Sequence, residues 1–470
     1  MSSNPTETGS PAEKSGGLLN SRHYALIILT LVYISSFVDR QIMSILLQPV
    51  KEEFGASDLE MGILGGFAFA IFYATLGIPL AMVADRANRR NLIALSITLW
   101  SGMTALGGYA QNFTHLLLAR IGVGVGEAGS GPASHSIIAD LYPLAERTRA
   151  MAVYSTGIHI GGSLGGLIGG VVAFYWGWRE AFLVVGLPGL LIAILLKLTV
   201  KEPVRGQSEG VIDGPEPLSL LEAVKQVVKP SSFVPVMDGF RLFWNSKALR
   251  HTIIGCTLVA FIGYGAALYG PAYMIRMFGL NLRDIGILSA VGSLFAVAGG
   301  VGAAWVADHR GKEDPRWIPW IVAATKLAAL PFIIAYYFQD TLWVALLFYI
   351  PIIALGATYQ GSTYSMVQTL SPKHMRAQSA AILLFVINLV GMGLGPTFVG
   401  AISDNLVSVV GDDTQSLRWA LAIVSSMGVW GAYHYYVAGK YYPAELAAMH
   451  AQEAAEEAQN GAQDGAPNES

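Results

Sequence analysis

Four charged residues of this sequence lie inside apolar stretches, where ionised groups are rare. Asp39 and Arg40 are adjacent in one stretch, and Arg120 and Glu127 lie seven residues apart in another. Residues seven apart share one face of a helix, whereas adjacent residues point about 100° apart and serve different partners. An ionised group at bilayer depth costs roughly 2.5–3.5 kcal/mol on insertion scales. We therefore expect these side chains to face other protein groups or a water-filled cavity.

The chemistry that this set can support is the exchange of ion pairs. A carboxylate that holds an arginine in one state and loses it in another binds and releases a proton, and we predict this role for Asp39 and Glu127. Guanidinium groups suit carboxylates and phosphates alike, so Arg120 is predicted to alternate between a carboxylate and an anionic substrate, with Arg40 as a second headgroup ligand. The alternative for each pair is a permanent structural ion pair.

Several neutral polar residues in other apolar stretches are candidates for contacts with a substrate. His159 either titrates in a cavity or is a hydrogen-bonded packing residue, and the sequence leaves both interpretations open. Aromatic rings suit an acyl chain while their polar ends stay hydrated, and an amide within a membrane needs a partner. The remaining members of the predicted substrate-binding set are Tyr264, Gln360, Tyr364 and Asn388.

The elements that position these residues are apolar segments of membrane-spanning length. Of the 470 residues, 53% are hydrophobic and 13% are charged, whereas soluble domains carry about 25% charged residues. We predict an all-α membrane protein with twelve transmembrane helices in two pseudo-symmetric six-helix bundles. The predicted helices are 24–49, 59–84, 91–110, 113–139, 148–174, 179–200, 249–276, 283–307, 317–337, 342–368, 375–402 and 416–440.

The chain divides into five parts on this basis. We predict a disordered cytoplasmic N-terminus at 1–20, bundles at 21–200 and 249–440, a cytoplasmic linker at 201–248 and a dispensable cytoplasmic tail at 441–470. Lys and Arg of the short loops gather on one side, which predicts that both termini of this multi-pass protein of the cell (inner) membrane are cytoplasmic. Within the linker, 218–228 has helical periodicity and is a candidate for lying on the membrane surface.

A short motif ends both the second and the eighth predicted helix, at 81–90 and 304–312. Each copy places an aspartate at the helix end, followed by basic residues. The aspartates are predicted to cap neighbouring helices while the arginines pair with acids on the adjoining helix, so that the pairs lock one state and break in the other. The alternative is a pure topology signal. The predicted gating residues are Asp85, Arg86, Arg89, Arg90, Asp308 and Arg310.

This repeat resembles the signature loop of the major facilitator superfamily, in which a glycine and three residues precede Asp, Arg and further basic residues. Ala81 and Ala304 stand where that pattern has glycine. The fourth predicted helix is similar to the superfamily's arginine motif, with Arg120 followed by alternating glycines. The resemblance implies paired repeats around a site at the membrane midplane.

A closer resemblance is to the spinster family of lipid transporters, which moves lysolipids and sphingosine 1-phosphate. It is carried by FVDRQ in the first helix, the run 122–150, GGSLGGLIGG at 161–170 and WRE at 178–180. In that family the positions matching Asp39, Arg40, Arg120 and Glu127 are tied to substrate binding and proton coupling. One departure is His159, which stands where spinster-like sequences tend to have proline.

Several other functions are excluded or unsupported. No Gly-x-x-x-x-Gly-Lys-Ser/Thr run occurs, which argues against nucleotide-driven transport. No His, Asp or Glu cluster has metal-ligand spacing and Cys256 is the single cysteine, so we predict no metal and no cofactor. The net charge of −3 gives no basic face for nucleic acid. We expect no enzymatic activity, because no plausible pair of nucleophile and base is present.

The sequence thus predicts a proton-coupled secondary active transporter that works by alternating access. The predicted partners are protons, membrane lipids and an amphipathic anionic lipid substrate, a lysophospholipid or a sphingosine 1-phosphate-like lipid, and we expect a monomer. One alternative is an organic-acid:proton symporter, which needs an enclosed polar cavity where a lipid needs an apolar, laterally open one. A second alternative is a non-transporting membrane sensor.

Overall fold

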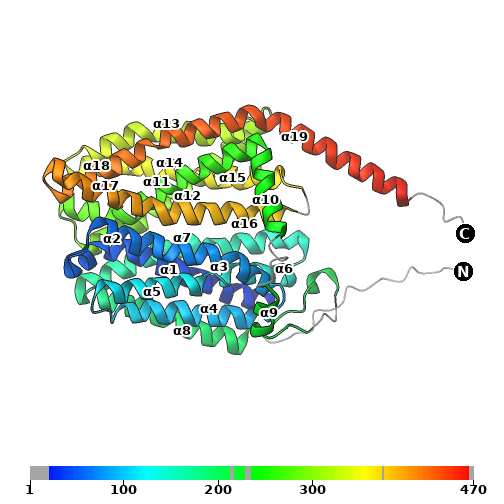
Figure 1. The fold of residues 1–470 in the computed structure, drawn as a ribbon, viewed down its shortest axis with the longest axis horizontal. Helices are drawn as coiled ribbons and strands as arrows, with labels where there is room; N and C mark the ends of the chain where they lie inside the picture. Colours follow the sequence, from blue (N-terminus) through cyan, green and yellow to red (C-terminus); the bar gives the residue numbers. More distant parts are fainter. Residues whose placement is uncertain (1–20, 212–215, 228–233, 373–374, 465–470) are drawn as a thin grey trace, which may run out of the picture.

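The structure, a computed structural model, describes residues 21–211, 216–227, 234–372 and 375–464. Long helices run back and forth along one axis and form two side-by-side bundles (Figure 1). In this described part, nine helices are long and apolar enough to cross a membrane. The remaining helices of the two bundles are either shorter, like α5 and α6, or more polar, like α4. The predicted N-terminal segment 1–20 lies outside the described residues.

The first bundle contains six rods, where a rod is one helix or several consecutive helical elements that cross the bundle together. Nine helical elements form these six rods. The elements α2, η2 and α3 follow one another without a turn, and α5 and α6 share a rod. The bounds are α1 Arg22–Phe54, α2 Asp58–Gly62, η2 Ile63–Phe67, α3 Ala68–Ala84, α4 Arg89–Gly107, α5 Phe113–Glu127, α6 Ser130–Leu141, α7 Leu144–Trp176 and α8 Trp178–Thr199.

The second bundle repeats this plan and confirms the predicted fold class of twelve helices in two six-helix bundles. Again some rods are composite, namely α14 with α15, α16 with η6 and α17, and α18 with α19. The bounds are α11 Lys247–Phe278, α12 Leu282–Gly311, α13 Trp317–Tyr337, α14 Leu342–Gly356, α15 Tyr359–Thr369, α16 Arg376–Val386, η6 Ile387–Leu394, α17 Gly395–Val410, α18 Asp413–Ser426 and α19 Gly428–Asp464.

The start of α1 and the extension of α19 lie at the same end of the molecule, which we call the terminal end; the other is the distal end (Figure 1). Between the bundles the chain forms η3 Gln207–Glu209, α9 Leu220–Val227 and α10 Val234–Asn245. The helix predicted at 218–228 is therefore present as α9. It buries Ala223 and Val227 and packs against the first bundle.

The C-terminal tail is helical and is tied to the second bundle. Glu445 accepts hydrogen bonds from the Ser246 hydroxyl and from the backbone N–H of Ala248, at 3.1 Å for the latter. Further along, Glu453 pairs with Arg376 at 3.2 Å. The tail thus holds the first residues of α11 and α16, so we expect its truncation to loosen these two helix ends.

The fourth rod is broken, so the expectation of a single helix across 113–139 is wrong. Helix α5 ends at Glu127 and α6 begins at Ser130. Pro132 explains the break, because its ring nitrogen has no hydrogen to donate to the carbonyl of Ala128 and its ring crowds that carbonyl. The break follows directly after one of the buried carboxylates.

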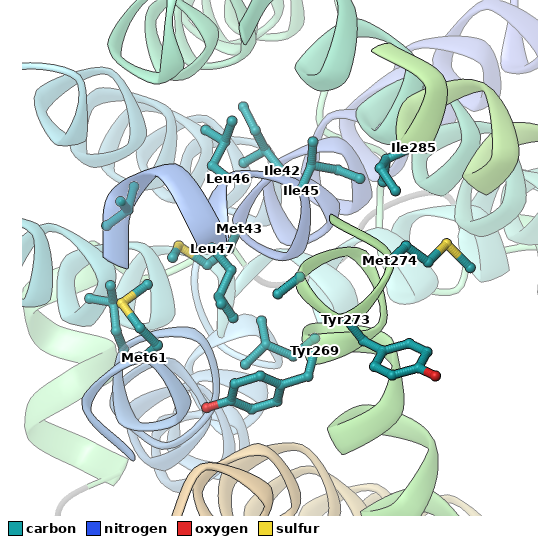
Figure 2. Packing of buried hydrophobic residues seen from close by; sticks show 14 of the residues in the cluster. Ile42, Met43, Ile45, Leu46, Leu47, Met61, Tyr269, Tyr273, Met274 and Ile285 are labelled. Atoms are coloured by element: carbon teal, nitrogen blue, oxygen red, sulfur yellow. The ribbon is translucent and has the colours of Figure 1, made fainter. Parts of the chain in front are cut away.

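A hydrophobic core joins the two bundles in the distal half. Figure 2 shows buried side chains of this core from both bundles, with Ile42 and Leu46 on one face of α1 and Leu47 on the face toward Met61 and Tyr269. This group includes Met61 of the second rod and Tyr269 and Tyr273 of α11, and all of these residues are at most 1% exposed. Burial of apolar area stabilises this contact, and it places α1 next to α11.

Candidate functional site

Helices α1 and α5 bring Arg40 and Glu127 together in the first bundle. One carboxylate oxygen of Glu127 accepts hydrogen bonds from Nε of Arg40 at 2.7 Å and from the Ser36 hydroxyl at 2.9 Å. The Glu127 side chain is fully buried and that of Arg40 is 18% exposed. This is a charge-assisted pair in a dry setting, which is stronger than the same pair in water.

Arg40 also lies against three aromatic rings of the first bundle. Its guanidinium carbon is 4.5 Å from the ring centre of Tyr73, 5.1 Å from that of Phe37 and 5.2 Å from that of Phe69. Cation–π attraction is largest where water is excluded. The rings therefore give Arg40 a second favourable environment, one that does not depend on Glu127.

Asp39 and Arg120 form the other half of the charged set. Asp39 is 0% exposed and Arg120 is 3% exposed. Both carboxylate oxygens of Asp39, and Nε and Nη1 of Arg120, are buried without a hydrogen-bond partner among the described residues. Asp39 lies within electrostatic range of Arg120, Glu127 and Arg40. The two acids and two arginines thus make one buried set whose hydrogen-bonding capacity is only partly used.

Glycine residues let α5 press its charged face inward. A Cβ on Gly124 would lie 2.5 Å from the carbonyl oxygen of Phe69, and one on Gly126 would lie 2.6 Å from the backbone nitrogen of Trp100. Real Cβ atoms do not approach so closely, so larger residues would push α5 away from α3 and α4. Arg120 and Glu127 reach α1 because these positions are glycine.

Two of the predicted aromatic residues of the second bundle lie near this set. Tyr264 is within electrostatic range of Arg40 and Tyr73, and Tyr364 is within range of Tyr264, Tyr33 and Tyr73. The structure therefore places tyrosines of both bundles around Arg40. Asn388, 8% exposed, is in η6.

The two other predicted substrate ligands are exposed, unlike the buried charges. Gln360 is exposed at the start of α15 and interacts with the neighbouring Tyr359. His159 is exposed on α7, one turn from Ser163, whose hydroxyl bonds to Ser293 of α12. His159 is therefore on the α7 face that meets α12.

An aromatic stack beside Arg40 was not anticipated from the sequence. Tyr33 and Tyr154 are parallel, with ring centres 4.4 Å apart, and His135 meets Tyr154 edge-on at 5.3 Å. Tyr33 also touches Phe37, which lies against Arg40. His135 lies in α6, after the break that follows Glu127. The sequence feature that could have pointed to it is a polar residue within the fourth apolar segment.

The motif copy in the first bundle forms a buried network with the linker. Arg89 is 0% exposed and binds Asp140 and Glu202, the latter at 2.7 Å, as well as the carbonyl oxygen of Pro203 at 2.9 Å. Arg90 donates its backbone N–H to the same Glu202 at 2.8 Å. The predicted pairing of arginines with acids on an adjoining helix is therefore present here, with the linker as a further partner.

The copy in the second bundle is different. Arg310 is 56% exposed in its side chain and reaches Glu313, on the next helical turn, at 3.9 Å. Asp308 is exposed. Neither aspartate caps the following helix, which corrects our expectation: Asn88 caps α4 by accepting the N–H of Asn91, and α13 starts at Trp317, whose N-cap residue Arg316 makes no side-chain cap. Asn88 holds that position because it immediately precedes the helix.

The distal end holds a charged cluster that the sequence analysis missed. Arg276 of α11 binds both carboxylate oxygens of Asp58 at 2.7 and 2.9 Å, and Lys51 and the Ser403 hydroxyl bind the same carboxylate at 2.8 and 2.7 Å. Asp404 of α17 accepts the backbone N–H of Asp58 and that of Leu59. In the sequence Asp58 looks like any acid in the first turn of a helix. We call Lys51, Asp58, Arg276, Ser403 and Asp404 the distal latch, since it joins the two bundles.

Helices α7 and α12 seal the same end at a second place. A Cβ on Gly286 would lie 2.5 Å from the carbonyl oxygen of Gly166, and one on Gly170 would collide with that of Leu282. Ser163 and Ser293 share a hydrogen bond at the inner edge of this contact. Contacts between the bundles are thus strong toward the distal end, in the arrangement that alternating access requires on its closed side.

Two six-helix bundles, the first of which holds a buried charged set, define the fold of a multi-pass membrane transporter. Residues 29–396 match the family model of the Major Facilitator Superfamily, and the chain belongs to this superfamily. Within it the chain is spinster-like. It is 28% identical over 456 residues to protein spinster homolog 1 of Xenopus tropicalis, covering 90% of this chain and 83% of that protein.

Two further relatives agree with this assignment. The chain is 31% identical over 424 residues to an MFS-type efflux pump of Mycolicibacterium smegmatis, covering 90% of this chain and 94% of that protein. A solved structure of a bacterial homologue of the human lysosomal transporter spinster, inward-facing and unoccupied, superposes with a TM-score of 0.79 at 28% identity, covering 90% of this chain and 98% of that one. The D-xylose-proton symporter shares the fold at 17% identity and a TM-score of 0.66.

Proposed function

We propose that this transporter couples protons to the movement of an amphipathic anion, a lysophospholipid or a sphingosine 1-phosphate-like lipid. The observation that carries the proposal is the buried ion pair of Glu127 and Arg40, next to Asp39 and Arg120 with unused hydrogen-bonding groups. A set of two acids and two arginines is neutral, so it tolerates burial while offering both a proton acceptor and an anion ligand.

The proposed exchange starts at Glu127. A proton on this carboxyl removes the negative charge that holds Arg40, and Arg40 then turns to an anionic headgroup while keeping its contact with Tyr73. Arg120 already has two N–H groups without an acceptor and becomes the second ligand. When the anion leaves, Arg40 returns to Glu127 and the proton is released.

The apolar part of the substrate is proposed to lie between tyrosines of the two bundles. Tyr33 and Tyr154 form a stacked wall on one side, and Tyr264 and Tyr364 approach from the other. Aromatic rings offer large apolar surfaces at small entropic cost. The spinster-like relationship favours a lipid in this space.

The orientation is inferred from the excess of Lys and Arg in the loops at the terminal end. We propose that this end is cytoplasmic and that the protein resides in the cell (inner) membrane as a monomer. Segments 21–200 and 249–440 are proposed to move as two bundles, and the tail lies on the cytoplasmic side. With the distal latch closed, the described state is then inward-facing. Opening of the latch, with closure at the terminal end around Asp85 and Arg86, completes the cycle.

An organic-acid:proton symporter is the second candidate. The chain is 28% identical over 298 residues, 60% of its length, to a probable L-galactonate transporter of Escherichia coli. The same charged set would serve a small carboxylate. Membership of a transporter superfamily favours either function over a non-transporting sensor.

Uptake into proteoliposomes with an imposed pH gradient tests both candidates. We expect labelled lysophosphatidic acid or sphingosine 1-phosphate to move in a gradient-dependent way and galactonate not to move. Asp39→Asn should abolish gradient-driven transport, and Arg120→Ala should raise KM for the anionic lipid. Asp238→Asn, an exposed position in α10, is the matched control. If galactonate is transported and neither lipid is, the organic-acid:proton symporter becomes the supported function and the lipid proposal is rejected.

A further inference from the structure

The terminal end of the second bundle carries a group of aromatic rings that each have a cation nearby. These rings belong to α10, α13 and α19, and the cations come from α11, α13 and α19. The pairs, with distances from cation to ring centre, are Arg250 with Trp244 at 5.8 Å, Lys247 with Tyr441 at 5.1 Å, Lys440 with Tyr436 at 4.6 Å and Arg316 with Trp320 at 5.9 Å.

These pairs lie on one continuous surface. The indole nitrogen of Trp320 donates to the carbonyl oxygen of Tyr436 at 3.2 Å, and a Cβ on Gly439 would collide with the same indole. Trp320 therefore lies across Gly439, next to Lys440 and Tyr441. Glu445 ties α19 to the start of α11. We call Trp244, Lys247, Arg250, Trp320, Lys440 and Tyr441 the cation–aromatic patch.

The cations of the patch have little negative charge to balance them. Among the described residues, Lys247, Arg250 and Lys440 form no ion pair with a carboxylate. Glu445, the nearby acid of α19, is occupied by Ser246 and Ala248. Trp244 is 71% exposed, so the patch faces outward. Its cations are therefore accessible to an anion from outside the protein.

The position of the patch points to the bilayer rather than to the cytoplasm. Helix α10 passes into the spanning helix α11 through the single residue Ser246. The patch therefore lies where the spanning helices leave the bundle. Trp and Tyr concentrate at membrane–water boundaries, and cations near such a boundary attract anionic headgroups. In the first bundle, by contrast, Arg22 beside Tyr142 is neutralised by Glu146 at 2.9 Å.

We propose that the cation–aromatic patch is a binding site for the headgroup of an anionic phospholipid of the surrounding leaflet. The phosphate lies among Lys247, Arg250 and Lys440, and the glycerol and upper acyl carbons pack on Trp244 and Trp320. The site holds lipid at the outer surface of α11, α13 and α19. It is therefore separate from the buried charged set and independent of the transported substrate.

The test compares lipid selectivity of the full chain in nanodiscs with spin-labelled phosphatidylglycerol and phosphatidylcholine. The test variant carries Lys247→Gln, Arg250→Gln and Lys440→Gln. The control carries Lys201→Gln, Lys225→Gln and Lys312→Gln, which remove the same charge from exposed positions outside the patch. We expect the native chain and the control to immobilise phosphatidylglycerol preferentially. One cation near an anionic surface is worth about a fivefold change in association, so the test variant should lose at least about fivefold of that preference.

Four outcomes would overturn the proposal. The first is equal immobilisation of the two lipids by the native chain, and the second is a test variant that keeps the native preference. The third is a dimer in which the patch is covered by a second copy, seen as a mass change that the test variant abolishes. Loss of the preference on adding inorganic phosphate would show a free-phosphate site instead of a lipid site. Single variants Lys247→Gln and Lys440→Gln, each with a partial loss, supply the same answer if the triple variant expresses poorly.

Discussion

The carboxylate of Asp404 accepts the backbone N–H of Asp58 at 2.9 Å and that of Leu59 at 2.8 Å, so a residue of the second bundle caps a helix of the first. These are the first two N–H groups of α2, which have no acceptor within their own helix. A cap of this kind is worth about 0.5–2 kcal/mol. It exists only while the bundles touch at the distal end, so the cap stabilises the latched state specifically.

Removing this cap should shift the balance between the two states. We expect Asp404→Ala to increase the distal-open population by roughly fivefold, the ratio that corresponds to about 1 kcal/mol. Spin labels on Cys introduced at Glu60 and Val409, both exposed, would report a longer distance, and the native Cys256 is buried and will not interfere. Asp412→Ala is the matched control, because Asp412 caps α18 within its own bundle by accepting the N–H of Gln415. An unchanged distance distribution in Asp404→Ala would remove the latch from the gating step.

Neutralising Glu127 should separate anion binding from proton coupling. In Glu127→Gln the Arg40 guanidinium loses its negative partner but keeps the rings of Tyr73 and Phe37. We expect this variant to bind sphingosine 1-phosphate with less pH dependence than the native chain while it loses gradient-driven uptake, as measured by a thermal-shift titration beside a flux assay. Retained pH dependence of binding would place the proton elsewhere.

The two copies of the repeated motif should contribute unequally to stability. Arg89→Ala leaves Asp140 and Glu202 without their buried partner, and breaking a buried ion pair costs about 3–5 kcal/mol. Arg310→Ala removes an exposed pair, which is worth about 1 kcal/mol or less. Thermal unfolding of the two variants in detergent compares them directly, and similar losses for both would contradict the difference in burial.

The seal between α7 and α12 depends on small residues. Gly170→Ala would bring a methyl group against the carbonyl oxygen of Leu282, while Gly162→Ala on the same helix meets nothing within 4 Å. We expect the first substitution to open the distal end, with faster labelling of Cys introduced at Ser289, and the second to be neutral or stabilising by up to about 1 kcal/mol. Equal labelling of both variants would show that α12 moves aside without cost.

Much of the architecture was predictable from the sequence. Segments of spanning length gave the rods of both bundles, and the cost of ionised groups in a membrane predicted that Asp39, Arg40, Arg120 and Glu127 turn inward. Adjacent residues on a helix point in different directions; Arg40 binds Glu127, and Asp39 lies within electrostatic range of both Glu127 and Arg120. These properties depend on composition and on local helix geometry, which one chain segment carries by itself.

The partners of these residues were decided by the tertiary structure. Asp58 and Asp404 are 346 residues apart. Nothing in either segment shows that the first turn of α2 lies against the side of α17. The same holds for the stack of Tyr33, Tyr154 and His135, which come from three different helices. The sequence by itself determined which groups must avoid lipid, since that follows from the cost of removing a charge from water. Which groups they meet depends on how the helices of the two bundles pack. Glycine positions allow close packing, but the sequence does not show which helix will lie against them.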